Sequence, residues 1–400
     1  MLSRNAKLYL VSTALNGLSF GVWGVIFNLY LGLSEVGFKA DFVGTMIMVN
    51  TLAVGLVALP AGLFCERVGL KKALLISALA NVANLFQIVI LQSELLLFAS
   101  LVSGLIGTVG WVASAPFMME NSTEEERTHL FSINWALMIL VGIVGSYVGG
   151  AMPDLLNGLL SLQTGPTTGS ALGYRFTLVF SVVLSIIAII PILLVKEAER
   201  ERKQKIGDLL TLRNIKSAGT IAKFMIPTAL IGFGAGFVVQ LFNTFFSLKY
   251  LATAEQVGIV FALGNVTLGV GTLAAPALSK KLGKVRSVVA CQFLSTPFIM
   301  LITLAPNLPL SSFAYVFRGA LMNMAGPITL TMQMEMVTEK ERATTNGLMV
   351  MADNIPRAMA ASLGGIMMTG SDFYTPFLVM TITYFVASSL FFLFFRKYKK

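Results

Sequence analysis

The sequence is poor in the side chains on which enzymes and metal sites depend. Its 400 residues include one histidine, His129, and two cysteines, and only 12% of them are charged. A Ser/His or Cys/His catalytic set would depend on that single imidazole, and metal–diphosphate binding would need clustered acids. The acidic cluster 124–126 begins a predicted helix, where the helix dipole favours negative charge in any case. With no Gly-Lys-Ser/Thr nucleotide loop either, the sequence predicts no enzyme, no metal and no cofactor.

Low charge leaves long apolar runs. The chain is 56% hydrophobic, with 29 Phe and 20 Met, whereas about a quarter of the residues are charged in a typical soluble domain. Charge-free stretches such as 8–34, 95–119 and 373–395 exceed the ~20 residues that span a bilayer. We predict an all-α membrane protein with twelve transmembrane helices, near residues 8–33, 42–64, 73–92, 95–119, 130–152, 175–195, 222–248, 256–279, 287–304, 310–334, 343–369 and 373–395.

The chain repeats itself. Residues 119–128 recur in modified form at 334–343, which is 215 positions later. The same offset relates Asn28 to Asn243 and many glycines to one another. The protein is therefore predicted to consist of two copies of one unit of roughly 200 residues, an arrangement by which transporters build a site between two halves.

The basic residues predict the topology. We expect an N-terminal six-helix half, a cytoplasmic linker and a C-terminal six-helix half at 1–195, 196–222 and 223–400. With both termini cytoplasmic, 24 of the 29 lysines and arginines fall on the inside, as the positive-inside rule requires. The net charge of +10 is thus a topology signal and not a nucleic-acid footprint. We expect a multi-pass protein of the cell (plasma or inner) membrane.

The loop after the second predicted helix carries an ordered set of glycines and charges. It runs from Gly62 through Glu66, Arg67 and Gly69 to Lys72. This order resembles the signature loop of the major facilitator superfamily, with Glu66 where that family more often has Asp. We expect Gly62 to allow close helix packing and Gly69 to allow a tight turn. With the twelve helices and the duplication, the resemblance covers essentially the whole chain.

The repeated segment supplies a second feature of that family. Six residues separate Glu120 from Arg127, and six separate Glu335 from Arg342. Together with the loop 62–72, these charges are candidates for a cytoplasmic gate, a latch of partly desolvated ion pairs that holds the two halves together. The alternative is that they are solvated loop charges that only set the topology.

The eleventh predicted helix carries charge near its middle. With a rise of about 1.5 Å per residue, Asp353 lies about 15 Å from the helix start, near the bilayer midplane. Arg357 follows one turn later, and Arg318 in the tenth helix lies at a similar depth. Charges at this depth indicate a functional site by default. Pro356 is expected to break the helix locally and free a carbonyl group.

Two interpretations of this cluster remain open. Asp353 either contacts the substrate or binds and releases a proton during the transport cycle, or it forms a fixed, neutral pair with Arg357 while Arg318 bonds elsewhere. The equivalent first-half positions are Met138 and Gly142. The charge cluster therefore belongs to the second half alone.

Polar residues of the first and seventh helices are further candidates. By the resemblance, these helices line the central cavity of the superfamily. Asn28 and Asn243 fall near the outer ends of their helices, so a gate or a helix–helix hydrogen bond is as good an interpretation as substrate contact. The candidates for substrate contact are Asn16, Trp23, Asn28, Gln240 and Asn243.

The resemblance implies a secondary active transporter that moves a small molecule by alternating access. The glycine-rich segment 145–150 is similar to a segment of drug antiporters, with Ser146 in place of proline. It favours proton-coupled efflux of an amphipathic or drug-like solute, although close helix packing also explains its glycines. The alternative is proton-coupled uptake of a small nutrient or organic solute. We expect a monomer whose partners are a small-molecule substrate, the lipid bilayer and protons as candidate coupling ion, with no nucleic acid.

Overall fold

The computed structural model describes residues 2–160, 171–196, 216–338 and 341–397. All regular secondary structure in these ranges is helical, as the sequence predicts. The side chain of the predicted gate residue Glu66 and most of the predicted linker lie outside the described part.

The first half of the chain forms six membrane spans, two of which are interrupted. They are α1 (Arg4–Gly32), α2 (Ala40–Val68), α3 (Leu70–Ser77) with α4 (Ala80–Val89), α5 (Ser93–Glu120), α6 (Glu124–Leu159), and α7 (Ala171–Ile187) with α8 (Ile189–Leu193).

The second half forms six more. They are α9 (Ala218–Gly236) with the 3₁₀ turn η3 (Val239–Leu241) and α10 (Phe242–Tyr250), α11 (Ala254–Leu282), α12 (Lys284–Leu304), α13 (Leu308–Met336), α14 (Arg342–Thr369) and α15 (Thr375–Phe395). The first of these spans differs from expectation in two ways: α9 begins inside the predicted linker, and the predicted helix 222–248 is broken at Val238, whose φ of −136° is not helical. The break follows glycines 232, 234 and 236, which are poor helix formers.

Two of the twelve spans are less apolar than the rest. Ten helical spans in the described part are long and apolar enough to cross a membrane by length and composition. The remaining two are α13 and α14, of 29 and 28 residues, which are long enough but carry the central charges Arg318, Asp353 and Arg357. The free-energy cost of placing charged side chains within the membrane is therefore borne by α13 and α14.

Polar side chains mark where several helices begin. The side chain of Ser3 accepts a hydrogen bond from the backbone N–H of Ala6 at the start of α1. Thr253 and Gln256 form a reciprocal capping box at the start of α11. Such caps satisfy the N–H groups that a helix leaves without an intrahelical partner.

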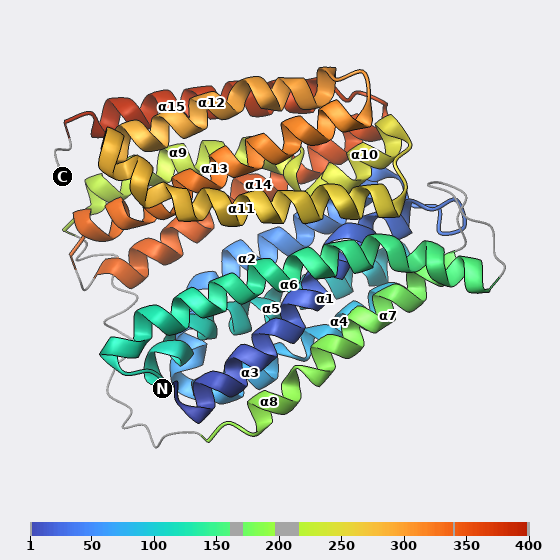
Figure 1. The fold of residues 1–400 in the computed structure, drawn as a ribbon, viewed down its shortest axis with the longest axis horizontal. Coiled ribbons are helices and arrows are strands. Elements are labelled where there is room, and N and C mark those ends of the chain that lie inside the picture. The colour runs from blue at the N-terminus through green and yellow to red at the C-terminus, as the bar shows by residue number, and fades with distance from the viewer. Residues whose placement is uncertain (1, 161–170, 197–215, 339–340, 398–400) are drawn as a thin grey trace.

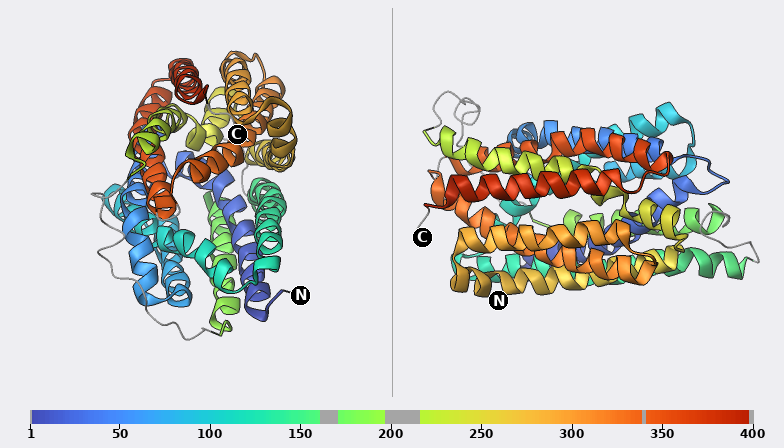
Figure 2. Two further views of the ribbon diagram at one scale, coloured as in Figure 1. Left: turned by 90° about the vertical axis from the view of Figure 1, so that its left-hand side faces the viewer. Right: turned by 90° about the horizontal axis from the view of Figure 1, so that it is seen from above.

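The two halves lie side by side as two bundles. In Figure 1, α1 to α8 form the lower bundle and α9 to α15 the upper one, with both termini at the left. Figure 2 shows the same bundles from that end and from above, and the long helices run in roughly the same direction. We call the end that carries the termini the terminal end and the opposite end the far end.

Small residues bring the halves into contact. A Cβ added to Gly44 of α2 would lie 2.5 Å from the carbonyl oxygen of Ala361 in α14, and one added to Gly258 of α11 would lie 2.8 Å from the Cα of Gly150 in α6. Helices in a membrane gain little from the hydrophobic effect when they associate, so close backbone packing at small residues supplies much of the contact energy. The interface between the halves therefore consists largely of these two helix pairs.

Candidate functional site

The position of the site follows from the close approach of α9 to α14. A Cβ on Gly232 would run into the carbonyl oxygen of Asp353, and a Cβ on Gly236 would run into that of Arg357. Only glycine tolerates such an approach, so these two residues hold α9 against the turn of α14 that carries both charges. Asp353 lies near the middle of the 28-residue helix α14, at the depth expected from the sequence.

Asp353 and Arg357 form a bidentate ion pair within α14. The Nε of Arg357 donates to Oδ2 of Asp353 at 3.0 Å, and Nη2 donates to Oδ1 at 2.7 Å. The side chains remain 29% exposed for Asp353 and 18% for Arg357. Two parallel charge-assisted hydrogen bonds give the pair a fixed geometry, while its residual exposure leaves the carboxylate within reach of a solute or proton.

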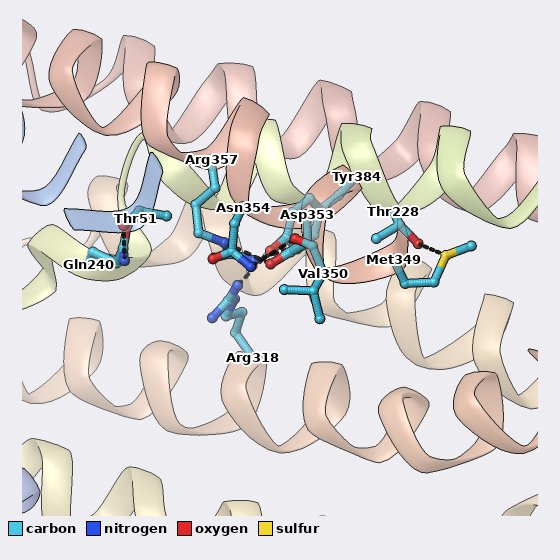
Figure 3. A network of polar contacts seen from close by, with 10 residues as sticks. All are labelled: Thr51, Thr228, Gln240, Arg318, Met349, Val350, Asp353, Asn354, Arg357 and Tyr384. Atoms are coloured by element: carbon cyan, nitrogen blue, oxygen red, sulfur yellow. Dashed lines mark hydrogen bonds and ion pairs between the residues drawn. The ribbon is translucent and has the colours of Figure 1, made fainter. Parts of the chain in front are cut away.

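Arg318 of α13 has a different partner. Its Nη2 donates to the hydroxyl oxygen of Tyr384 in α15 at 2.9 Å. The guanidinium carbon lies 5.7 Å from the ring centre of Tyr384 and 5.9 Å from that of Phe242. The residue is only 7% exposed, and among the described residues its Nε has no acceptor. Arg318 is therefore bonded away from Asp353, although Figure 3 shows it pointing from α13 toward the turn of α14 that carries Asp353.

These four residues, Arg318, Asp353, Arg357 and Tyr384, are called the charge cluster below. Their geometry is the one expected for a neutral pair with Arg318 bonded elsewhere. Whether Asp353 also carries protons or contacts substrate stays a prediction, because its remaining exposure is compatible with either role.

The expected break at Pro356 does not occur. Helix α14 continues through this residue without interruption. Proline has no N–H group, so the carbonyl of Ala352 loses its usual donor one turn later, but packing against α9 and α2 keeps the helix in register. Asn354, beside the pair, donates from Nδ2 to the carbonyl oxygen of Val350 at 2.9 Å and so stays bonded to its own helix.

The two repeat-related asparagines meet at the far end. Asn28 of α1 donates to Oδ1 of Asn243 at 3.0 Å and to the carbonyl oxygen of Gln240 at 3.0 Å. Asn243 donates back to the carbonyl oxygen of Val25 at 3.0 Å, and Gln240 donates to the hydroxyl of Thr51 in α2 at 3.1 Å. These bonds join the two halves, so the helix–helix interpretation describes the observed contact. We call this network the far-end seal.

Asn16 and Trp23 are not brought to the charge cluster. The amide of Asn16 donates to the carbonyl oxygen of Ser12, one turn earlier on α1, at 3.1 Å. Trp23 stacks on Phe27, with ring centres 4.3 Å apart. Both described contacts stay within α1, and a role for either residue in substrate contact stays a prediction.

The two glycines of the predicted gate loop differ in their roles. Gly69 has a φ of +95°, which favours glycine, and its counterpart Gly283 has a φ of +79°. Each ends one helix and begins the next, so the expected tight turn is present in both halves. The close packing expected at Gly62 is absent: an added Cβ would meet Val112 only at 4.0 Å, an ordinary contact.

The described contacts of the gate charges lie within single halves. Lys284 donates from Nζ to both carboxylate oxygens of Glu335 at 2.6 Å. The Nε of Arg342 donates to the carbonyl oxygen of Met334 at 3.1 Å. Both contacts belong to the second half. In the first half Arg67, Lys72 and Glu120 are exposed, and Nε of Arg127 is buried without an acceptor in the described part. A latch across the halves stays a prediction for a conformation in which the terminal ends close.

Glu341, which the sequence analysis did not predict as a site residue, bonds Ser217 at the start of the second half. Glu341, just before α14, accepts hydrogen bonds from the hydroxyl of Thr338 at 2.6 Å and from the hydroxyl of Ser217 at 2.7 Å. These hydrogen bonds lower the pKa of Glu341 to about 2, and the bond from Thr338 has the larger effect. The signal was present in the sequence as Thr338 three residues before Glu341, the spacing of a capping box.

Tyr384 and Thr51 were also overlooked. Tyr384 is the one tyrosine of α15, and Thr51 is one of two threonines in α2. Neither has a local pattern that marks it. Only the packing of α15 on α9 and α12, and of α2 on α14, brings them to the polar groups of other helices.

The described residues contain no group of three or more His, Cys, Asp and Glu side chains that could hold a metal ion. The site instead consists of two arginines, one carboxylate and one hydroxyl at mid-depth between helices of a duplicated twelve-span body. This is the architecture of a membrane transporter with a central polar site.

The family model for the Major Facilitator Superfamily matches residues 9–250 and again residues 228–400. The chain belongs to the major facilitator superfamily, whose members are transporters. No curated protein sequence matches the chain closely enough to count as a relative.

Solved structures of similar fold agree with this assignment. The nucleoside transporter NupG has a TM-score of 0.77 at 14% identity, with 99% of this chain and 100% of that chain covered. A D-xylose-proton symporter has a TM-score of 0.73 at 13% identity, covering 97% and 96%. A bacterial homologue of the iron transporter ferroportin, in an inward-facing state, has a TM-score of 0.74 at 13% identity, covering 98% of each chain.

Proposed function

We propose that this protein carries a small polar organic solute across the cell membrane by alternating access, in symport with protons, and that the charge cluster forms part of its binding site. The observation that carries the proposal is the charge cluster itself. Ionisable groups at mid-depth are costly, and in transporters they mark the path of substrate or protons. Asp353 is the proposed proton carrier because it is an acid in the middle of a span and remains 29% exposed.

The polarity of the cluster favours a polar solute over a drug-like one. Apolar or cationic drugs would gain little from two arginines, one of which is already neutralised. Two proteins of similar fold are described as a nucleoside transporter and a D-xylose-proton symporter. Both names concern polar solutes, which supports the same broad class here.

Export of an amphipathic solute is the alternative, and the segment 145–150 was its main support in the sequence. In the structure a Cβ on Gly145 would run into the carbonyl oxygen of Leu18, and one on Gly149 would lie 2.8 Å from the Cα of Val22. A Cβ on Gly150 would lie 2.6 Å from the carbonyl oxygen of Ala254. Helix packing therefore accounts for these glycines, so they no longer argue for export.

The described bonds between the halves suggest the conformational state. The far-end seal joins the halves through Asn28, Gln240 and Asn243, whereas the described contacts of Glu335 and Arg342 stay within one half. With the termini in the cytoplasm, this is an inward-facing arrangement. The gate charges would then bond across the halves in the outward-facing state.

The direction of coupling can be tested in proteoliposomes. Labelled nucleosides, sugars, organic acids and fluorescent amphipathic dyes are offered to vesicles with an imposed pH gradient. A symporter accumulates its solute in vesicles whose exterior is more acidic, and an antiporter in vesicles whose interior is more acidic, whichever way the protein has inserted. We expect a polar solute to accumulate with the acidic exterior. Accumulation of dyes alone, with the acidic interior, would overturn the proposal in favour of export.

A further inference from the structure

The charge cluster holds one positive charge more than it holds negative charge. Arg318 and Arg357 are both cations, and Asp353 is the one carboxylate of the cluster. The other acids that the structure describes in the second half lie at helix ends or in connections: Glu255, Glu335, Glu341 and Asp372. Because both carboxylate oxygens of Asp353 bond Arg357, the unbalanced charge is that of Arg318.

The bonding of Arg318 is incomplete. A guanidinium group has five N–H donors, and among the described residues Arg318 makes one hydrogen bond, to Tyr384. Its Nε is buried without an acceptor, and the residue is 7% exposed. The rings of Tyr384 and Phe242 lie near the guanidinium, but a ring quadrupole is a weaker partner than an anion. A buried cation that lacks a counter-charge is expensive unless something supplies one.

We propose that the transported solute bears an anionic group, a carboxylate or a phosphate, which binds Arg318 and supplies the missing negative charge. This inference rests on the proposed function, since it names the chemical class of the solute that the same site carries. A planar guanidinium with several free N–H groups matches the oxygens of a carboxylate or phosphate in bidentate fashion.

Tyr384 provides a second donor for the same group. Its hydroxyl oxygen accepts from Arg318, and among the described residues its own O–H proton has no acceptor. A hydroxyl can accept and donate at once, so the proton is available to an oxygen of the bound anion. Arg357 is a poorer candidate, because its Nε and Nη2 already bond Asp353.

The first half contains a similar arginine–tyrosine pair in which the tyrosine hydroxyl is bonded on both sides. Arg175 of α7 donates from Nε to the hydroxyl of Tyr30 at 2.8 Å, and its guanidinium carbon lies 5.9 Å from that ring. The Tyr30 hydroxyl in turn donates to the carbonyl oxygen of Ile88 at 2.8 Å. Arg175 lies near the far end, well away from the charge cluster, and thus serves as the matched control.

The test measures binding without transport. The full-length protein, purified in detergent, is heated in the presence of matched probes: benzoate and benzamide, phenylacetate and phenylacetamide, glucose 6-phosphate and glucose, and inorganic phosphate alone. We expect at least one anionic probe to raise the unfolding temperature by about 2 °C or more while its neutral partner does not. The Arg318→Gln variant should lose at least about tenfold in affinity for that anion, since charge-assisted hydrogen bonds are removed.

Further variants separate binding from folding. Arg318→Lys keeps the charge without the planar fork, so it should retain part of the shift, while Arg175→Gln should retain all of it. Neutral probes that stabilise as well as their anions would overturn the proposal, and so would an undiminished shift in Arg318→Gln or the absence of any shift with every anion. If anions bind through Arg318 but no solute is transported, the proposed function fails and the anion site stands. If a neutral solute is transported without anion binding, the anion site is refuted and the proposed function stands.

Discussion

In the first half of the molecule α1 packs on α6 through Gly17 and Gly21, and in the second half α9 packs on α14 through Gly232 and Gly236, at the same positions of the repeat. A Cβ on Gly21 would lie 2.7 Å from the carbonyl oxygen of Gly142. A Cβ on Gly236 would run into the carbonyl oxygen of Arg357, the residue equivalent to Gly142. The two halves therefore share this helix contact almost position for position.

The two halves differ in the residues that lie at this helix contact. In the first half the equivalents of the ion pair are Met138 and Gly142, which carry no charge, whereas in the second half they are Asp353 and Arg357. The contact at Gly232 is also tighter than at Gly17, where a Cβ would lie 3.7 Å from the Cα of Met138. Duplication thus provided the frame twice, while the charges that a solute or proton could use occur in one copy only.

The largest effect is expected from neutralising Asp353, whose charge has no equivalent in the first half. Asp353→Asn leaves Arg357 without its carboxylate, and breaking a largely buried pair from one side costs about 3 kcal/mol. We expect the unfolding temperature to fall and accumulation driven by a pH gradient to disappear. The double variant Asp353→Asn with Arg357→Gln should recover most of the stability, because the uncompensated charge is removed with its partner.

Uphill transport and solute exchange, measured on the same vesicles, separate the two roles of Asp353. A proton carrier predicts that the double variant regains exchange without regaining accumulation. If the double variant also accumulates solute against the gradient, Asp353 is part of a structural pair only. An uncharged pair, such as the first half has at these positions, would then support transport equally well.

The difference in packing predicts the next largest effect. Gly232→Ala places a methyl group against the backbone of Asp353 and should destabilise the protein by about 1–3 kcal/mol. Gly17→Ala meets only ordinary contacts and, with its better helix propensity, should be neutral or slightly stabilising. Thermal unfolding of the two single variants tests the comparison. Equal losses would mean that the two contacts are equivalent after all.

The far-end seal and the gate charges should respond in opposite directions. Asn28→Ala or Asn243→Ala removes bonds that join the halves at the far end, so the outward-facing population should rise by a few-fold, as expected for the loss of about 1 kcal/mol. Arg67→Ala or Glu120→Ala weakens the proposed latch and should raise the inward-facing population instead.

Single reporter cysteines, labelled at each end in a background that lacks Cys65 and Cys291, measure both shifts. Both native cysteines are buried, and replacing each with alanine removes one sulfur atom. Labelling that rises at the same end for both sets of variants would contradict the assignment of the two ends.

The smallest effect concerns Glu341, which bonds Thr338 and Ser217 at the start of the second half. Its pKa is about 2 in the folded protein against an ordinary value of 4.5. A depressed carboxylate pKa stabilises the folded state fully above pH 4.5, and that stabilisation is lost as the pH falls toward 2. The unfolding temperature of wild type should therefore approach that of Glu341→Gln over this range. Glu335→Gln, which removes a partly exposed pair with Lys284, is the control and should show a smaller difference at neutral pH.

Much of the architecture could be predicted from the chain alone. The charge-free stretches indicated twelve spans because an apolar run of about 20 residues crosses a bilayer as a helix that satisfies its own backbone, and the offset between Asn28 and Asn243 indicated two related halves. The tight turn at Gly69 was predicted correctly from the conformational freedom of glycine. The expected break at Pro356 and the close packing at Gly62 were wrong, because both depend on neighbouring helices that local sequence does not specify.

Hydropathy, periodicity and spacing along the chain are enough to specify that the protein lies in a bilayer, that its helical frame is duplicated and that charge lies at mid-depth. Which charges meet depends on how the helices pack. This packing paired Asp353 with Arg357, bonded Arg318 to Tyr384 of a helix 66 residues further on, and joined Asn28 to Asn243 across the halves. Hydrogen bonds and ion pairs depend on ångström-scale distances between helices, and those distances are set by the glycine contacts of the packed bundle.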